Sequence, residues 1–178
     1  MRKIIAELAM SVDGFIARPN GDVDWLDRPS PKGFYGMEKF FKTIDMMVMG
    51  RATYEVGKKL GGPLFMFPTT VILSRSLAPN AVPGAVIEKG TPRKLAERWR
   101  KQKGKNIWLM GGAEVFGQFL DAGVLDELSI AVIPVLIGTG IPLLDPKRRT
   151  TQLELMSTKK YSDGVVRLHY SALKAAVS

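Results

Sequence analysis

The sequence predicts an α/β protein with a mainly parallel central sheet, helices on both faces of that sheet and an antiparallel hairpin at the C-terminal end. Short apolar runs alternate with helical patterns over most of the chain, an order typical of parallel strands joined by crossover helices. Two strand patterns then follow without a helix between them, Leu153–Lys160 and Val165–Ser171. The turn sequence Ser162-Asp163-Gly164 joins them and favours a hairpin.

Each predicted element has its own signal. The strands of the parallel part are short apolar runs at Ile4–Met10, Met46–Met49, Thr70–Leu73, Ala85–Ile87, Ile107–Met110 and Leu128–Ile133. Apolar residues at helical spacing predict two helices, one carrying Met37, Phe40, Phe41 and Ile44 and the other Val115, Phe116, Phe119 and Leu120. A third helix is expected to begin at Thr91, with a capping hydroxyl ahead of Pro92, and to stop at Gly104.

Length and composition favour one domain over residues 1–178. Of the 178 residues, 46% are hydrophobic, which is enough for a single core. Loops 18–32 and 134–149 contain apolar anchors, so we expect functional loops there and not linkers. No apolar run approaches the ~20 residues of a membrane helix, the first strand pattern lacks a signal-peptide cleavage site, and no cysteine is present for a thiolate metal site. We expect a cytoplasmic protein without a metal site.

The net charge of +9 favours an anionic partner without choosing its class. The densest basic run, residues 93–105, places Leu95, Ala96 and Trp99 at helical spacing, which indicates the solvated face of an amphipathic helix. A nucleic-acid-binding module would interleave exposed aromatic residues with the charge, whereas Trp99 falls on the apolar side. We therefore expect a small-molecule partner, and neither nucleic acid nor membrane.

Two turns of the same kind are the most informative features. Strand 47–49 runs into Gly50-Arg51-Ala52-Thr53, and strand 107–110 runs into Gly111-Gly112-Ala113-Glu114. In each turn a glycine permits close approach to the backbone, and the free N–H groups of the following helix favour an anion. Together the turns could hold a pyrophosphate at one sheet edge. A third strand ends in Ser74-Arg75-Ser76, which with Arg51 offers guanidinium groups for a further phosphate.

These motifs, in this order, resemble the dihydrofolate reductase superfamily. Residues 5–17 resemble its opening strand and loop, 48–54 its Met-Gly-Arg-x-Thr turn, and 72–75 and 110–116 its later motifs. The resemblance implies a dihydrofolate-reductase-like three-layer fold and an NADPH site. The residues that it assigns to the cofactor are Ala9, Ile16, Gly50, Arg51, Thr53, Ser74, Arg75, Met110, Gly111, Gly112, Ala113, Glu114 and Val115.

Departures from the folate enzymes indicate a branch of the superfamily. Met37 stands where they carry an acid on the first helix, with Glu38 about 100° further around it. Residues 67–70 offer no arginine for a glutamate tail. Residues 11–17 (Ser-Val-Asp-Gly-Phe-Ile-Ala) and 133–140 instead resemble the reductase domain of the riboflavin-pathway deaminase–reductase and its stand-alone relatives.

The resemblance implies an NADPH-dependent oxidoreductase of the 5-amino-6-(5-phosphoribosylamino)uracil reductase type. Hydride would pass to a C=N or C=O carbon of a small heterocyclic substrate, with the cofactor supplying the difficult chemistry. Reduction of a dihydropterin and a non-catalytic NADPH-binding relative stay open as alternatives. Because the reductases that this chain resembles commonly pair, we also expect a homodimer.

Four residues are candidates for the substrate pocket: Glu7, Trp25, Met37 and Glu38. Glu7 shares a strand face with Ala9, and a carboxylate there must meet solvent, a cation or a ligand. It is therefore a substrate-facing acid, half of a structural pair or a solvated residue. Trp25 either caps the site or anchors its loop. His169, the only histidine, is expected to be packed or exposed and not catalytic.

Overall fold

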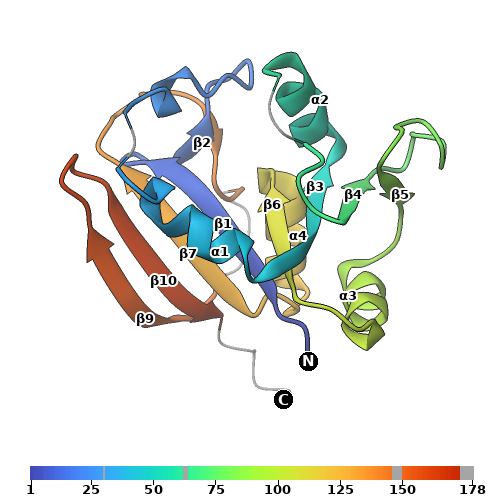
Figure 1. The fold of residues 1–178 in the computed structure, drawn as a ribbon. Coiled ribbons are helices and arrows are strands. Elements are labelled where there is room, and N and C mark those ends of the chain that lie inside the picture. The colour runs from blue at the N-terminus through green and yellow to red at the C-terminus, as the bar shows by residue number, and fades with distance from the viewer. Residues whose placement is uncertain (30, 62–63, 146–149, 173–178) are drawn as a thin grey trace.

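A computed structural model describes residues 1–178 except 30, 62–63, 146–149 and 173–178. Its centre is an eight-stranded sheet in the order β5-β4-β3-β6-β1-β7-β10-β9 (Figure 1). Neighbouring strands are parallel from β5 through β7, and β10 and β9 complete the sheet as an antiparallel hairpin. The predicted α/β class, with a mainly parallel sheet and a C-terminal hairpin, is confirmed.

The bounds of the elements follow the sequence patterns closely. The strands are β1 (Ile4–Ser11), β2 (Phe15–Ala17), β3 (Ile44–Gly50), β4 (Thr69–Leu73), β5 (Val86–Glu88), β6 (Asn106–Gly111), β7 (Glu127–Ile133), β8 (Ile141–Pro142), β9 (Leu153–Lys160) and β10 (Val166–Ala172). The helices are α1 (Met37–Phe41), α2 (Arg51–Lys59), α3 (Pro92–Lys101) and α4 (Ala113–Asp121), with short 3₁₀ segments at Asp24–Leu26 and Phe34–Gly36. Each predicted strand is present, with ends within two residues of the prediction.

Hydrophobic clusters pack on both faces of the sheet and separate the helices into two layers. On one face, α3 and α4 cover Ile4 and Ala6 of β1, and the fully buried ring of Trp99 stacks on Phe119 with centroids 5.9 Å apart. The other face carries Ile5 of β1 and packs against α1 and α2. Trp99 is buried, and Arg93, Lys94, Arg98 and Lys101 are exposed on the outer face of an amphipathic helix, as predicted. Arg100 departs from this pattern, since its side chain is only 16% exposed and pairs with Asp126.

The structure corrects two predicted helix ends. The first helix stops at Phe41, and Ile44 is the first residue of β3, because its side chain is buried within the sheet's core. The third helix stops at Lys101, before Gly104. At Gly104 (φ +152°) a Cβ would collide with the Asp45 carboxylate, so this glycine permits a close approach to the Arg2–Asp45 ion pair. The hydroxyl of Thr91 makes no capping hydrogen bond.

The sequence patterns missed two short strands, one just before loop 18–32 and one within loop 134–149. Strand β2 pairs antiparallel with β8 in a separate two-stranded sheet. The backbone of Gly140, just before β8, approaches Ala17 of β2 so closely that a Cβ there would clash with the Ala17 carbonyl. These strands tie loop 134–149 to the loop after β1, although residues 146–149 lie outside the described residues.

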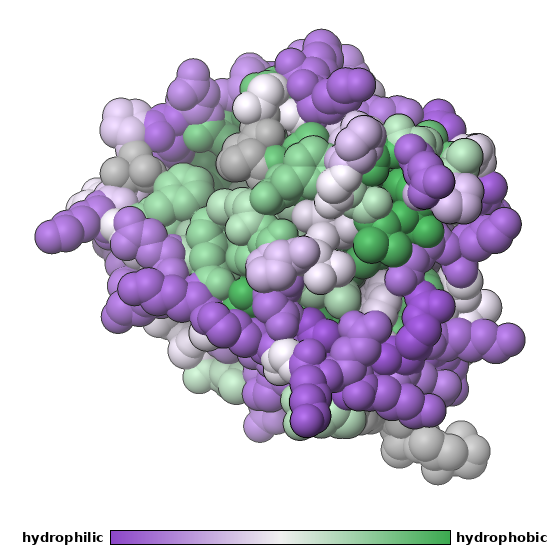
Figure 2. Space-filling view, turned by 45° about the vertical axis from the view of Figure 1, so that its right-hand side comes forward, coloured by the Kyte–Doolittle hydropathy of each residue, from purple (hydrophilic) through white to green (hydrophobic). Residues whose placement is uncertain are grey.

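One face of the surface carries an apolar region (Figure 2). Figure 2 shows hydrophobic side chains in the middle of one face, surrounded by hydrophilic ones. The exposed apolar residues between the end of α2 and β5 are Leu60, Phe65, Met66 and Val86. Among the described residues, no helix is long and apolar enough to cross a membrane.

Candidate active site

The two glycine turns meet at one edge of the sheet, because β3 and β6 are neighbours and both end there. A Cβ on Gly50 would lie 2.9 Å from Cγ2 of Val115, in the first turn of α4. A Cβ on Gly112 would lie 3.1 Å from Oγ1 of Thr53, in the first turn of α2. Each glycine therefore makes room for the first turn of the other helix. Gly111 has φ +110°, and the Gly111–Gly112 peptide bond is cis.

Helices α2 and α4 both begin at this edge with free backbone donors. Gly50 and Gly112 are their N-cap residues, and neither has a side chain that could accept a hydrogen bond from the first turn. The first N–H groups of a helix attract anions, and the helix dipole adds to that attraction. Two helix starts beside a pair of glycines form a cradle that suits a diphosphate.

The end of β4 adds polar groups beside this cradle. Arg51 Nη1 donates to Ser76 Oγ at 2.7 Å, and Ser74 Oγ lies 3.4 Å from the same Ser76 oxygen. Glu55 also holds Arg51, whose Nε lies 2.8 Å from Glu55 Oε1. The structure thus brings Arg51 and Ser74 together, as the sequence predicts, while the Arg75 side chain is exposed.

Two of the sequence motifs form one structural unit at the end of β1. Asp13 accepts hydrogen bonds from the Ser11 hydroxyl at 2.6 Å, the Gly138 N–H at 2.7 Å and the Ile137 N–H at 3.1 Å. The Ser11 hydrogen bond, supported by these backbone donors, holds the pKa of Asp13 below its ordinary value. This unit fixes the loop that carries Ile16, a residue expected at the nicotinamide.

Glu7 lies two residues before Ala9 on the same strand, and its side chain is 5% exposed. Arg167 Nη2, from β10, donates to Glu7 Oε2 at 2.6 Å. Burial raises the pKa of the Glu7 carboxyl above its ordinary value, although the positive charge of Arg167 and a hydrogen bond from Ser129 oppose this shift. A buried carboxyl group with a raised pKa can hold a proton at higher pH than an exposed one.

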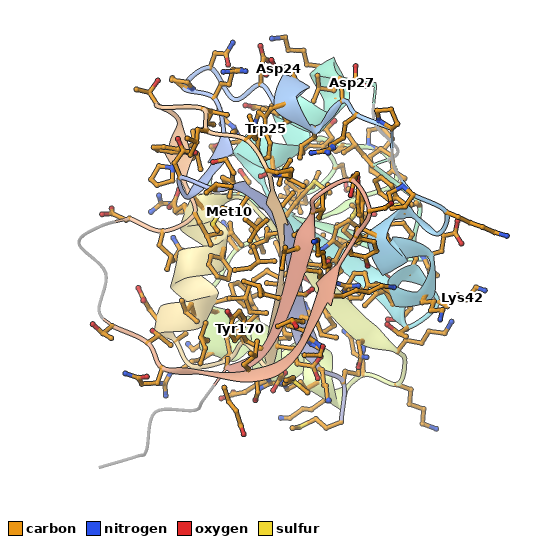
Figure 3. All side chains as sticks on the ribbon, turned by 90° about the vertical axis from the view of Figure 1, so that its left-hand side faces the viewer. Met10, Asp24, Trp25, Asp27, Lys42 and Tyr170 are labelled. Carbon is orange, nitrogen blue, oxygen red and sulfur yellow. The ribbon has the colours of Figure 1, made fainter. Side chains whose placement is uncertain are left out.

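Trp25 turns inward between the exposed residues Asp24 and Asp27 (Figure 3). Its ring is 91% buried and packs with Ile133 and Tyr161, against which Ala9 also packs. Within the described part of the chain, its indole Nε1 is buried without a hydrogen-bond partner. The ring anchors its loop within the cluster against which Ala9 packs.

Comparison with known proteins decides the family. Residues 2–167 match the model of the RibD C-terminal domain. The chain belongs to that family. It is 37% identical over 172 residues to the uncharacterized protein YwjB of Bacillus subtilis, covering 95% of this chain and 97% of that protein. The uncharacterized protein YyaP of the same organism is 29% identical, covering 95% and 94%.

Solved structures share the fold of this RibD C-terminal domain. A candidate riboflavin biosynthesis protein from Shewanella sp. PV-4 superposes with a TM-score of 0.81 at 24% identity, over 97% of this chain and 99% of the other. A diaminohydroxyphosphoribosylaminopyrimidine deaminase/5-amino-6-(5-phosphoribosylamino)uracil reductase from Thermotoga maritima gives 0.75 at 17% identity, over 97% of this chain and 57% of the other. The family match confirms the predicted resemblance to the riboflavin-pathway reductase domain, and these structures confirm the fold.

Helix α1 offers no acid to the interior of this RibD C-terminal domain. Met37 is half-buried and packs against the core cluster of its face. Glu38 is exposed, and a Cβ on Gly33 would lie 3.9 Å from its Oε2, so the carboxylate turns toward the preceding loop. Neither residue places a carboxylate beside Ala9.

Sequence reasoning missed Ser129 and Arg167, the partners of Glu7, as well as Tyr35 and Tyr161, which meet Arg167 at the Tyr35 carbonyl. Ser129 and Arg167 are polar residues inside otherwise apolar strands, and Arg167 Nε donates to Ser129 Oγ at 2.7 Å. A polar residue within an apolar strand is the same signal that singled out Glu7, and it could have identified Arg167 as the partner of Glu7. His169 is partly exposed, and its Nε2 lies 3.0 Å from Glu127 Oε2.

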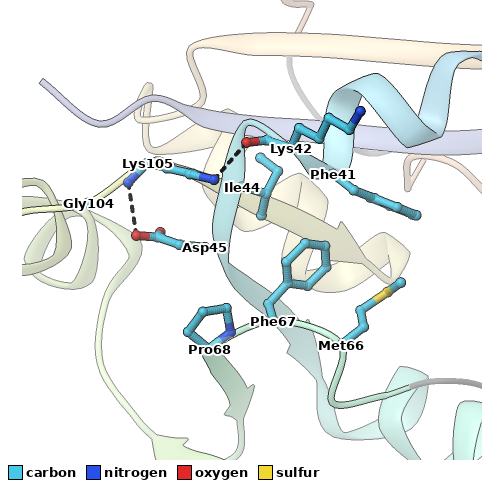
Figure 4. Close-up of a pocket in the computed structure, with 9 residues that line it drawn as sticks. All are labelled: Phe41, Lys42, Ile44, Asp45, Met66, Phe67, Pro68, Gly104 and Lys105. Atoms are coloured by element: carbon cyan, nitrogen blue, oxygen red, sulfur yellow. Dashed lines mark hydrogen bonds between the residues drawn. The ribbon is translucent and has the colours of Figure 1, made fainter.

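A hollow of about 460 Å³ lies at the other ends of the strands, away from the two glycine turns (Figure 4). It is lined by Phe41, Lys42, Ile44, Asp45, Met66, Phe67, Pro68, Gly104 and Lys105. These residues lie at or before the N-terminal ends of β3, β4 and β6, whereas Gly50 and Gly111 are at the other ends of their strands. Lys105 donates from its backbone N to Asp45 and from Nζ to the Lys42 carbonyl, each at 2.9 Å. The hollow is separate from the glycine cradle.

Proposed function

We propose that this chain is an NADPH-dependent reductase that transfers hydride to a C=N or C=O carbon of a small heterocyclic substrate, of the 5-amino-6-(5-phosphoribosylamino)uracil reductase type. One observation carries the proposal. The starts of α2 and α4 pack on each other's glycines at one sheet edge, beside the hydrogen-bonded pair of Arg51 and Ser76. Membership of the RibD C-terminal domain family supports the same reaction class.

The residues at the sheet edge fit the phosphates of NADPH. The backbone donors after Gly50 and Gly112 would hold the diphosphate, because both helix starts lack a competing side-chain cap. Arg51, Ser74 and Arg75 would hold the 2′-phosphate of the adenosine ribose through charge-assisted hydrogen bonds. When bound, the cofactor would supply the hydride. A protein of this kind mainly positions the reactants and excludes water.

The buried groups beside Ala9 fit the proton side of the reaction. Hydride addition to the C=N carbon of an opened ribosylamine requires one proton on the nitrogen, and the product is a ribitylamine. Glu7 is the nearest buried acid to Ala9 along β1, and its raised pKa suits a group that holds and returns a proton. The Trp25 ring shields this region from water through its packing with Tyr161 and Ile133.

Reduction of a dihydropterin is less well supported. That reaction would use an acid on α1, where Met37 packs into the core and Glu38 is exposed. It would also use a cation before β4, where residues 67–70 are Phe-Pro-Thr-Thr.

An assay with purified protein tests the proposed reaction. NADPH oxidation is followed at a fixed cofactor concentration with the ribosylaminopyrimidine phosphate and, separately, with dihydrofolate. We expect turnover of the first and little of the second. Turnover of dihydrofolate alone would overturn the choice of substrate class, and binding of NADPH without turnover of either compound would favour the non-catalytic alternative.

A further inference from the structure

We propose that Arg167 is a positioning residue of the substrate site, which holds Glu7 and the backbone segment Gly33–Gly36 in fixed places relative to each other. The proposal rests on the proposed reductase function, since it assigns these groups to the site beside Ala9. Three hydrogen bonds carry it, and each goes to a different element of the fold.

The guanidinium group of Arg167 bridges β1, β7 and the loop before α1. Its Nη2 donates to Glu7 Oε2 at 2.6 Å, its Nε to Ser129 Oγ at 2.7 Å, and its Nη1 to the carbonyl of Tyr35 at 3.2 Å. Arginine is suited to this task because its donors form a rigid planar fork, whereas lysine offers a compact point charge on a flexible stem. The side chain therefore fixes the relative places of its three acceptors.

The segment Gly33–Gly36 needs such support. All four residues have left-handed backbone angles, with φ +81° at Gly33, +44° at Phe34, +56° at Tyr35 and +89° at Gly36. Phe34 and Tyr35 carry side chains that disfavour this conformation, which persists only where neighbouring contacts hold it. A Cβ on Gly36 would lie 2.7 Å from Arg167 Nη1, so the segment is shaped around the guanidinium group.

The C-terminal hairpin supplies the remaining contacts of the segment. The Tyr161 hydroxyl donates to the same Tyr35 carbonyl at 2.6 Å, and the Tyr35 hydroxyl donates to the carboxylate of Asp163. The rings of Tyr35 and Tyr161 meet edge to face with centroids 5.1 Å apart. Two donors on one carbonyl, from Arg167 and Tyr161, fix the place of this peptide group.

The segment leads directly into α1 and shares a hydrophobic cluster with Ala9. Tyr35 and Ala9 both pack against the cluster formed by Trp25, Ile133, Tyr161 and Val165. The groups that act on Glu7 are Arg167 and His169 from β10 and Ser129 from β7. Arg167 is the cation in direct contact with it, while His169 bonds to Glu127. Arg167 therefore sets both the charge next to Glu7 and the position of the segment.

Four variants separate these two effects: Arg167→Met, Arg167→Lys, Tyr161→Phe and the control Lys160→Met, an exposed position of the same hairpin. The titration midpoint of Glu7 is measured by ¹³C NMR of protein labelled at the glutamate side-chain carboxyl, with Glu7→Gln assigning the signal. Hydrogen exchange reports the amides of Phe34 and Gly36, which bond within the loop to Pro31 and Gly33. NADPH affinity and the pH dependence of NADPH-linked reduction of the ribosylaminopyrimidine phosphate complete the set.

We expect Arg167→Met to raise the titration midpoint of Glu7 by about one pH unit or more, because the buried carboxylate loses its cation. Hydrogen exchange of the Phe34 and Gly36 amides should become roughly tenfold faster, because the loop loses a hydrogen-bond donor. Arg167→Lys should have the Glu7 midpoint of the unmodified protein but the faster amide exchange of Arg167→Met. Tyr161→Phe should accelerate exchange without moving the midpoint, and Lys160→Met should change neither. The acid-dependent limb of the pH–rate profile should follow the Glu7 midpoint.

An unchanged midpoint or unchanged loop exchange in Arg167→Met would overturn the proposal. If that variant does not fold, equal exchange in Arg167→Lys, Tyr161→Phe and the unmodified protein would overturn it instead. Failure of the unmodified protein to bind NADPH would count against the proposed function, while the NMR and exchange results would still decide whether Arg167 positions Glu7 and the segment.

Discussion

The glycine at the end of β3 is packed against the helix that follows β6: a Cβ on Gly50 would lie 2.9 Å from Cγ2 of Val115. The backbone of one turn can approach the other only because Gly50 has no side chain. A Cβ on the partner glycine, Gly112, would meet the Thr53 hydroxyl at 3.1 Å, a looser contact than the one at Gly50.

This difference makes Gly112→Val a clean test of the cradle. We expect the variant to fold, because the nearest atom to a new Cβ is the rotatable Thr53 hydroxyl at 3.1 Å, and to lose NADPH binding because the valine fills the space before both helix starts. Ala81→Val, at an exposed turn, is the matched control and should bind normally. Normal cofactor binding by folded Gly112→Val would make the turn structural only.

Cofactor preference should depend on the end of β4. Arg75 is exposed, and Arg51 bonds to Ser76, whose Oγ lies 3.4 Å from Ser74 Oγ. Arg75→Ala should remove on the order of 1–3 kcal/mol of the preference for NADPH over NADH, the size expected for a charge-assisted contact. The two dissociation constants, measured for the variant and the unmodified protein, give this number. An unaltered ratio would remove Arg75 from the site.

Glu7→Gln should lower turnover of the true substrate while leaving NADPH affinity unchanged. The substitution keeps the shape of the side chain and removes the proton that we assign to the reaction, a contribution of roughly 10²–10⁴ in rate for a general acid. Steady-state kinetics on the ribosylaminopyrimidine phosphate, with dihydrofolate in parallel, measure the effect. Full activity in Glu7→Gln would return Glu7 to a structural pair with Arg167.

The same residue predicts a pH-dependent stability. Burial raises the pKa of Glu7 in the folded state, so the folded protein binds this proton more tightly than the unfolded chain does. The stabilising contribution is complete below the ordinary glutamate pKa and is lost as pH rises through the raised value. Relative to Glu7→Gln, the free energy of unfolding of the unmodified protein should therefore fall across that window. Denaturant titrations at a series of pH values test the sign, and an opposite slope would contradict the raised pKa.

We expect a homodimer to form through β9, the edge strand of the C-terminal hairpin. Strand β9 pairs only with β10 among the described strands, and its Leu155 and Met156 are 53% and 52% exposed. Exposed edge strands with apolar side chains pair readily with another copy. Light scattering across the micromolar range should give a dimer, and Leu155→Lys should shift it toward monomer. A monomer throughout that range would contradict the prediction.

The fold could be predicted because each strand carries its own apolar run, and the β9–β10 hairpin also carries its own turn sequence. The candidate cofactor edge could be predicted from two glycine turns, because each turn is a short pattern of neighbouring residues. The surroundings of Glu7 could not be predicted in the same way. Arg167 lies 160 residues away in sequence, and only the strand order β1-β7-β10 brings it near. The length of α1 was missed because Ile44 continues a helical pattern, yet it is buried as the first residue of β3.

Direct titration of the unmodified protein with NADPH and NADH, followed by the change in tryptophan and nicotinamide fluorescence, tests the central claim. The cradle formed by Gly50, Gly112 and the starts of α2 and α4 predicts saturable binding of NADPH, tighter than that of NADH and lost in Gly112→Val. Binding of neither cofactor would contradict the assignment of this chain as a reductase.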